Sequence, residues 1–151
     1  MLFRSPRFLP SLLRLPSMVR ADTETEAQAI DLMNYVGLGA WIDADADAMP
    51  YGALKRLEIA RALAAKPRLL LLDEPAAGLN PVETASIDEL IKRIARSGTT
   101  VVLVEHDMKL VMGVSDHVLV LDYGRKLAEG TAAEVRANPE VIRAYLGLGA
   151  A

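Results

Sequence analysis

Three short runs of branched apolar residues stand out along the chain, and each is bounded by polar or turn-forming residues. They cover residues 68–73, 99–104 and 117–121. Apolar runs of this length, with almost no polar position inside them, are typical of strands in a sheet that is covered on both faces. After the third run, Tyr123-Gly124 predicts a turn into a further short strand at residues 126–128.

Helices are predicted around these runs from residues that begin and end helices. Thr23 and Glu26 have the spacing of a capping box, ahead of a helix that reaches residue 36. Pro50 can open a second helix, which reaches about residue 65. Three further starts are Asn80-Pro81 with Glu83, Thr131 with Glu134, and Asn138-Pro139. The helix that begins at Asn80 is expected to end near residue 97, before Gly98.

The first two strands and the helix between them form one unit of about 30 residues, which is the size of a βαβ crossover. A crossover of this kind joins parallel strands, so residues 68–73 and 99–104 are expected to run parallel. The fold class is therefore α/β. Ligands of open α/β sheets bind outside the carboxyl ends of the strands, which makes that edge the place to look for a site.

Composition and charge exclude several classes of function. The 151 residues of 16.3 kDa contain no cysteine, and His106 and His117 are the two histidines. Disulfides, thiolate sites and a three-histidine zinc site are thereby excluded. No apolar run approaches the roughly 20 residues that cross a bilayer. Residues 1–20 carry a charge of +4 and the remaining residues a charge of −7, and this acidic body argues against a nucleic-acid partner.

Charged side chains follow the first two predicted strands at the point where each strand ends. The first strand ends in Asp73-Glu74 and the second in Glu105-His106-Asp107. Parallel strands bring these groups to one edge of the sheet. Two adjacent carboxylates there suit a division of labour, in which one holds Mg²⁺ and the other accepts a proton from an attacking water. The imidazole can then contact a phosphate oxygen.

Each of these pieces also has an ordinary structural explanation. An Asp-Glu pair after a strand commonly begins a solvated loop, a single histidine after a strand is usually structural, and Asn80-Pro81 is a routine helix start. Their joint occurrence, in this order and at βαβ spacing, favours the functional interpretation.

Four blocks of the sequence resemble a known family, the ATPases of ATP-binding cassette (ABC) transporters. Residues 69–75 resemble its Walker B motif, residues 77–80 its D-loop, and residues 102–107 its switch-histidine strand. Residues 51–63 resemble the signature motif and its helix. The blocks keep the order and spacing of the family, and the resemblance covers roughly residues 20–147.

The resemblance extends to one subfamily, the ATPase subunits of branched-chain amino-acid importers. Residues 73–84, residues 105–112 and the tail at residues 138–147 are similar to those subunits. The resemblance implies a partial P-loop NTPase core with parallel strands and part of the helical subdomain. It divides the chain into a remnant of the helical subdomain at residues 1–48, a signature, Walker B, D-loop and switch-histidine part at residues 49–130, and a helical tail at residues 131–151.

The family also implies roles for individual residues. Glu74 is the expected general base and His106 the expected contact of the γ-phosphate, while Asp73 is expected to hold the Mg²⁺ shell. The residues expected to face the nucleotide of a partner subunit are Pro50, Tyr51, Gly52 and Ala53. Two further expected nucleotide-binding residues, Gly78 and Asn80, belong to the D-loop, which is expected to lie across the dimer interface. The implied cofactors are ATP and Mg²⁺. The implied partners are a second ABC ATPase subunit, in a homo- or heterodimer, and transmembrane permease subunits, at the cytoplasmic face of the plasma (inner) membrane.

The sequence departs from the family pattern at the signature motif. The family commonly has Leu-Ser-Gly-Gly-Gln, whereas residues 49–53 read Met-Pro-Tyr-Gly-Ala. Pro50 lacks the serine hydroxyl and Ala53 lacks the glutamine amide. The backbone contact through Gly52 can survive these changes.

A second departure concerns the phosphate-binding loop. The pattern G-x-x-x-x-G-K-S/T, whose backbone and lysine cradle the phosphates, does not occur in the 151 residues. In the family, the strand before this loop lies between the strands at residues 99–104 and 117–121. Without that strand the sheet is expected to split or to close imperfectly, with an unpaired apolar edge at residues 101–104 and a marginal fold in isolation.

Three functional hypotheses follow. In the first, the chain is the C-terminal part of an importer ATPase and is active only when the missing segment is supplied. In the second, it is a non-catalytic interaction module or a truncated pseudo-ATPase that docks on a transporter or a sibling ATPase. The third, another P-loop enzyme such as a DNA-repair ATPase, is disfavoured by the acidic body and the importer-like tail.

Overall fold

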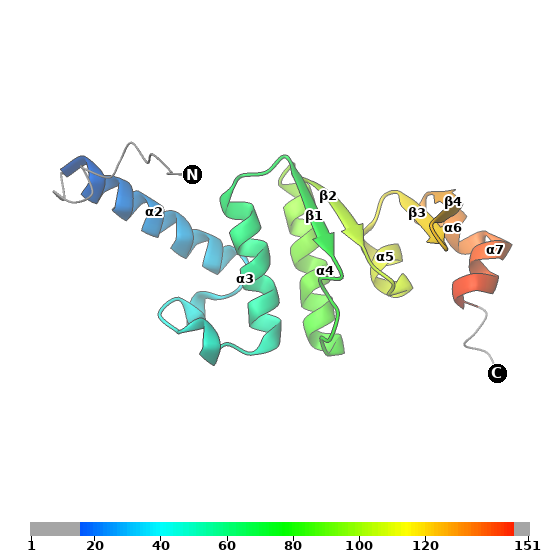
Figure 1. Cartoon of the computed structure of the whole chain (residues 1–151), viewed down its shortest axis with the longest axis horizontal. Coiled ribbons are helices and arrows are strands. Elements are labelled where there is room, and N and C mark those ends of the chain that lie inside the picture. The colour runs from blue at the N-terminus through cyan, green and yellow to red at the C-terminus, as the bar shows by residue number, and fades with distance from the viewer. Residues whose placement is uncertain (1–15, 147–151) are drawn as a thin grey trace, which may run out of the picture. The chain divides into compact units, whose positions relative to one another are not determined.

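A computed structural model describes residues 16–146 of the chain. The chain divides into two compact units, one that ends at Lys66 and one that begins at Pro67 (Figure 1). The expected family subdomains at residues 1–48, 49–130 and 131–151 stay a prediction. None of the described helices is long and apolar enough to cross a membrane.

The first unit contains two α-helices, α2 (Pro16–Tyr35) and α3 (Tyr51–Ala64), and two 3-10 turns between them, η1 (Gly39–Trp41) and η2 (Ala46–Ala48). The expected start of α2 at a Thr23 capping box is wrong, because Thr23 lies inside the helix. A proline is favourable at the first position of a helix, so Pro16 can open α2 one turn and more before Thr23. The bounds of α3 agree with the prediction to within one residue, with Pro50 as its N-cap.

Helix α2 packs against α3, and a tight turn after α2 makes this possible. Val36 and Leu38 at this turn are each 1% exposed, and Gly37 between them has a φ of 80°. The Arg56 guanidinium of α3 donates a hydrogen bond to the Val36 carbonyl oxygen at 3.2 Å. The φ of Gly37 favours glycine at this turn, and a Cβ atom there would displace the flexible end of Arg56, whose guanidinium it would meet at 2.9 Å.

The second unit begins with the predicted βαβ crossover. Strand β1 (Leu69–Asp73) pairs in parallel with β2 (Thr100–Val104), and helix α4 (Pro81–Arg96) joins them. The amphipathic helix α4 packs against β2 through a buried stripe, which consists of Ile87, Leu90, Ile91 and Ile94. The register places Asp73 opposite Val104, so both strands end at the same edge, as predicted.

The rest of the second unit is a hairpin with short helices packed around it. Strand β3 (Val118–Asp122) pairs antiparallel with β4 (Arg125–Gly130). The apolar core between this hairpin and the short helices consists of Val118, Val120, Ala128, Val135 and Val141. The predicted capping boxes of α4 and of α6 (Ala132–Ala137) are both present. The remaining elements are α5 (Met108–Val114), which the sequence analysis did not anticipate, α7 (Pro139–Val141) and a π turn, η3 (Ile142–Leu146).

The strands form two separate two-stranded sheets, β1–β2 and β3–β4, as expected if an intervening strand is missing. The expectation that the strands are covered on both faces is wrong for the described residues. Leu70 and Leu72 are buried, whereas Leu69 and Leu71 of the same strand are 52% and 68% exposed. Helix α4 covers one face of the β1–β2 sheet, and no described element of the second unit buries the other face.

Candidate functional site

The candidate site begins where β1 ends. Asp73 is the exposed last residue of β1, and the Glu74 backbone N–H donates to the Val104 carbonyl oxygen at 2.9 Å, which extends the pairing with β2 by one residue. Glu74 has a φ of 44°, in the left-handed region that non-glycine residues seldom adopt. Such backbone conformations cost about 1–3 kcal/mol and are concentrated at functional sites. Glu74 is therefore an unusual residue on conformational grounds alone.

The Glu74 side chain meets His106 from the end of β2. The His106 Nδ1 atom lies 3.2 Å from Glu74 Oε1, and the two side chains are 72% and 51% exposed. An ionised carboxylate can only accept hydrogen bonds, so this contact requires the proton on Nδ1. Glu74 does not engage the Nε2 atom, which can donate to a ligand oxygen when the ring carries a second proton. The prediction that an acid pair and an imidazole gather at one sheet edge is confirmed in its geometry.

Glu105 is a further member of this cluster to which the sequence analysis gave no role. Its side chain is only 2% exposed. Oε1 accepts from the Ala76 backbone N–H at 3.2 Å, and Oε2 accepts from those of His106 and Asp107 at 3.0 and 3.4 Å. Oε2 also lies 3.7 Å from His106 Nδ1. The sequence does contain one indication of this role, because Glu105 directly follows an apolar strand. A carboxylate that is buried at such a position needs hydrogen-bond donors to offset the cost of burial.

The loop between β1 and α4 carries two further predicted residues. Gly78 has a φ of 76°, which its missing Cβ permits. Asn80 is the N-cap of α4, where its Oδ1 accepts from the Val82 and Glu83 backbone N–H groups, each at 3.0 Å. The Glu83 carboxylate closes the capping box on the Asn80 N–H at 3.1 Å. Asn80 thus has a structural task in the chain, and its contact with nucleotide stays a prediction.

The four predicted signature residues lie at the start of α3 in the first unit. Pro50 is exposed and extended, with a ψ of 157°, and the Tyr51 side chain is half-exposed. The Lys55 ammonium lies 5.7 Å from the centre of the Tyr51 ring, within the range of a cation–π contact. Gly52 and Ala53 are buried. The contacts of these four residues with a nucleotide stay predictions.

Asp107 serves the helix that follows the cluster. Its Oδ1 accepts from the Lys109 and Leu110 backbone N–H groups at 2.8 and 3.3 Å and so caps the N-terminus of α5. This cap fixes the direction in which the chain leaves the end of β2, directly after His106.

Asp88 on α4 has an unfavourable environment for its charge. Its Oδ1 is buried and meets no hydrogen-bond partner within residues 16–146. Burial raises the pKa of the Asp88 carboxyl above its ordinary value, Lys92 opposes the shift, and the negative charges of Asp107, Glu89 and Glu105 add to it. Two carboxylates from the end of β2, those of Glu105 and Asp107, therefore help to raise the pKa of Asp88 on α4.

The site can supply part of what Mg²⁺ and a nucleotide require. Mg²⁺ is usually held by one or two carboxylates together with water and substrate phosphates, and the exposed Asp73 at the sheet edge suits that role. Residues 16–146 contain no group of three or more acidic, histidine or cysteine side chains that forms a complete metal cage. The missing ligands would have to come from water and phosphate.

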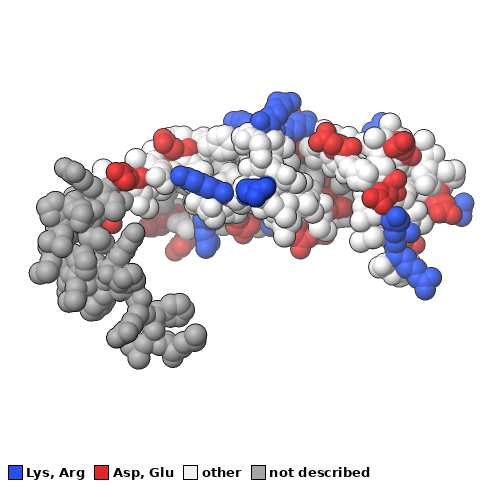
Figure 2. Space-filling model, turned by 90° about the horizontal axis from the view of Figure 1, so that it is seen from above, with Lys and Arg blue, Asp and Glu red and all other residues white. Residues whose placement is uncertain are grey.

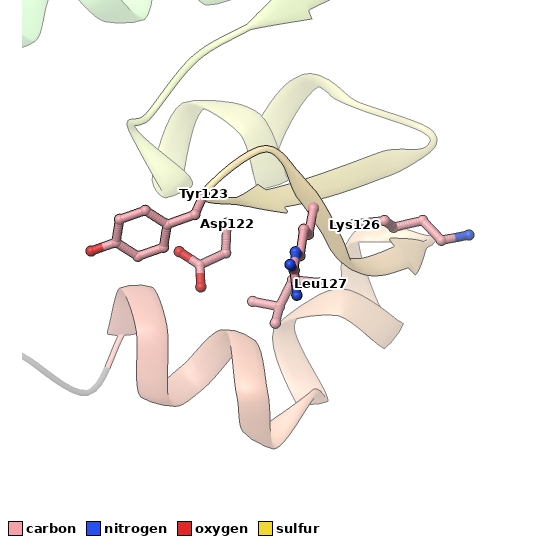
Figure 3. Close-up of a pocket in the computed structure, with 5 residues that line it drawn as sticks. Asp122, Tyr123, Lys126 and Leu127 are labelled. Atoms are coloured by element: carbon pink, nitrogen blue, oxygen red, sulfur yellow. The ribbon is translucent and has the colours of Figure 1, made fainter.

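A shallow hollow elsewhere in the second unit does not coincide with this cluster. It lies at the turn between β3 and β4 and is lined by Asp122, Tyr123, Arg125, Lys126 and Leu127 (Figure 3). The phenol of Tyr123 is almost fully exposed, and Lys126 points away from the hollow. None of these residues is a predicted site residue. On the face shown in Figure 2, acidic and basic side chains are interspersed, without a broad basic surface.

Two known protein families match parts of the chain. Residues 2–77 match the model of the ABC transporter family, and residues 125–151 match the family of branched-chain amino acid ATP-binding cassette transporters. The first match covers the predicted signature and Walker B motifs, and the second covers β4 and the tail.

Individual relatives agree with the family matches. The high-affinity branched-chain amino acid transport ATP-binding protein LivG of Salmonella typhimurium is 49% identical over 137 residues, which are 90% of this chain and 54% of LivG. BraF of Pseudomonas aeruginosa, a protein of the same description, is 45% identical over 93% of this chain and 55% of its own length. The chain thus spans about half the length of the curated relatives it matches.

Solved structures give the same fold. A crystal structure of the ADP conformation of MJ1267, an ATP-binding cassette of an ABC transporter, superposes with a TM-score of 0.74 at 29% identity and covers 82% of this chain and 50% of that one. The expected partial ABC ATPase core is thereby confirmed. With its cassette fold and with half of its residues matching the family, the chain belongs to the ATP-binding proteins of ABC transporters, in the branched-chain amino acid group.

Proposed function

We propose that the chain is the C-terminal part of the ATP-hydrolysing subunit of a branched-chain amino-acid importer, and that it is active when the rest of the ATPase domain is supplied. The observation that carries this proposal is the 3.2 Å approach of His106 to Glu74 at the carboxyl edge of the parallel strands. The substrate class is supported by the printed descriptions of LivG and BraF.

Each residue of the cluster has one task in the proposed reaction. Glu74 orients the attacking water and takes its proton on the carboxylate, since its exposed side chain can reach solvent. In its doubly protonated form, His106 donates from Nδ1 to Glu74 and from Nε2 to an oxygen of the γ-phosphate, where it limits the build-up of charge. Asp73 holds water in the Mg²⁺ shell, and the bound metal neutralises phosphate charge.

The proposed subunit works in an assembly. Pro50, Tyr51, Gly52 and Ala53 face the ATP of a second ATPase subunit, because a helix N-terminus such as that of α3 favours anions. Gly78 and Asn80 lie at the contact between the two subunits. Transmembrane permease subunits complete the importer, with the ATPase at the cytoplasmic face of the inner membrane.

One alternative has its own observation in support. The 151 residues lack a phosphate-binding loop, and Ala53 stands where the family commonly has glutamine. Both features fit a non-catalytic module that keeps the helical unit and the docking surfaces of an ATPase.

The proposal is tested by supplying the region that the relatives have upstream of the matched residues, as a separate polypeptide, and measuring ATP turnover. Turnover is expected to appear with the supplied region, and Glu74→Gln is expected to lower it by about 10²–10⁴-fold, the usual contribution of a general base. Glu89→Gln, at an exposed carboxylate of α4, serves as the control and leaves turnover unchanged. A Glu74→Gln variant as active as the parent overturns the assignment, and an inactive but assembled parent supports the non-catalytic alternative.

A further inference from the structure

The carboxylate of Glu105 connects the two loops that carry the candidate catalytic residues. We propose that Glu105 is a positioning residue, which holds the loop after β1 against the loop after β2 and fixes the orientation of His106 beside Glu74. This inference rests on the proposed function for its catalytic consequence, whereas the connection itself is a property of the chain alone.

The contacts of Glu105 span both loops. Its Oε1 accepts from the backbone N–H of Ala76, which is 29 residues away in the sequence and two residues after Glu74. Its Oε2 accepts from the backbone N–H groups of His106 and Asp107. One carboxylate therefore holds three backbone donors from two segments that the pairing of β1 with β2 no longer constrains.

The burial of Glu105 makes this connection specific. With a side chain only 2% exposed, the carboxylate has little access to water and depends on its protein donors. Burying a charge is costly unless hydrogen bonds compensate it, and hydrogen bonds to a charged acceptor are stronger than those between neutral groups. A glutamine has the same shape but carries an NH₂ group, which would face a backbone N–H instead of accepting from it. The three donors therefore select a carboxylate at this position.

The same carboxylate affects the imidazole. Glu105 Oε2 lies 3.7 Å and Glu74 Oε1 3.2 Å from His106 Nδ1, so two acceptors favour a proton on this nitrogen. A ring whose Nδ1–H points at these acceptors directs Nε2 away from them, and a second proton on Nε2 then allows the imidazolium to donate to a phosphate oxygen. Glu105 thus acts through His106 and through the backbone near Glu74, without touching the substrate itself.

The first test uses the chain alone, without nucleotide. Backbone amide exchange of the parent is compared with that of Glu105→Gln and of the control Glu89→Gln. The Ala76 and His106 amides are expected to be protected in the parent and to exchange about 10–100-fold faster in Glu105→Gln, the size expected for loss of a charge-assisted hydrogen bond. Amides within the β1–β2 pairing are expected to change little in either variant. An unprotected Ala76 amide in the parent, or unchanged protection in Glu105→Gln, overturns the proposal.

A spectroscopic measurement separates positioning from a merely structural role. Nitrogen NMR of the His106 ring is expected to show the proton on Nδ1 in the parent and a shift toward Nε2 in Glu105→Gln, while Glu89→Gln matches the parent. If all three proteins show the same tautomer, the proposal that Glu105 positions the His106 ring is overturned.

The second test uses the chain together with the supplied remaining region. Glu105→Gln is expected to lower kcat by about 10–100-fold with little change in the KM for ATP, because a misplaced base and imidazole weaken the transition state more than the bound substrate. Normal kcat in Glu105→Gln, alongside an inactive Glu74→Gln, overturns this inference and leaves the proposed function standing. Normal kcat in Glu74→Gln overturns the proposed function instead, whatever the amide measurements show.

Discussion

The Nδ1 atom of His106 and the Oε1 atom of Glu74 lie 3.2 Å apart, although 32 residues separate the two side chains in the sequence. The parallel register of β1 and β2, which sets Asp73 opposite Val104, brings them together. Each strand therefore contributes one member of a pair that neither strand could form alone.

This pairing predicts that the two residues act as a unit. In the reconstituted ATPase, His106→Ala and Glu74→Gln are each expected to lower kcat, and the double variant is expected to be little worse than the more damaging single variant. Steady-state turnover of the four proteins gives the comparison. If the two effects multiply, the residues act independently and the pair is not a functional unit.

Nucleotide affinity of the chain alone is expected to be weak. The phosphate-binding loop is absent from the 151 residues, and Asp73, Glu74 and His106 alone offer few contacts to the phosphates. The expected Kd for Mg·ATP is no tighter than about 1 mM, which corresponds to roughly −4 kcal/mol of binding free energy. Isothermal titration calorimetry checks this value. A micromolar Kd would show that the chain contains a phosphate site of another kind.

Two neighbouring leucines of β1 are expected to behave in opposite ways. Leu72 is 9% exposed, and Leu72→Thr is expected to lower the free energy of unfolding by about 2–5 kcal/mol, because it removes buried apolar volume and buries a hydroxyl. Leu71 is 68% exposed, and Leu71→Thr is expected to change stability by about 0.5 kcal/mol or less while it reduces self-association through the apolar sheet face. Urea unfolding and light scattering measure the two effects. Equal destabilisation by both changes would contradict the one-sided burial of β1.

The environment of Asp88 predicts a pH dependence of stability. Burial raises the pKa of this carboxyl in the folded state above its ordinary value of 3.8, so the folded chain holds the proton more tightly than the unfolded chain. Its contribution to stability is therefore fully present below pH 3.8 and is lost as the pH rises through the folded pKa. Asp88→Asn is expected to match the parent near pH 3 and to exceed it in unfolding free energy at pH 7.

A matched control comes from the adjacent Glu89. A hydrogen bond from Lys92 lowers the pKa of Glu89, so its contribution has the opposite sign and is lost as the pH falls. Denaturant unfolding of the parent, Asp88→Asn and Glu89→Gln between pH 3 and pH 7 tests both signs. A parent that gains as much stability as Asp88→Asn over this range would contradict the assigned environment of Asp88.

Much of the fold could be predicted because its signals are local. The capping boxes that begin at Asn80 and Thr131 involve residues three apart, and both are present in the structure. The apolar runs gave the strands to within a residue or two. The parallel pairing followed from the length of the crossover, and the juxtaposition of Glu74 with His106 followed from the pairing.

What the sequence could not show depends on contacts between distant segments. Burial of a strand face is decided by the elements that pack on it, so the exposed Leu71 could not be told from the buried Leu72 by the apolar run alone. The contact of Glu105 with Ala76 joins residues 29 apart and leaves no local pattern. Helix α5 has only seven residues, too few for a clear apolar period, and its N-cap Asp107 also belongs to the switch-histidine block, so the sequence pattern does not indicate a helix there.

The left-handed backbone of Glu74, with its φ of 44°, has a consequence for how this protein can evolve. Glycine would adopt that conformation without the steric penalty of a Cβ atom, which is about 1–2 kcal/mol for an L-residue. Glu74→Gly would therefore relieve a conformational cost, whereas the role proposed for Glu74 as a general base requires the carboxylate. Under the proposed function, a glutamate at this position exchanges some stability of the fold for a base at the reacting water.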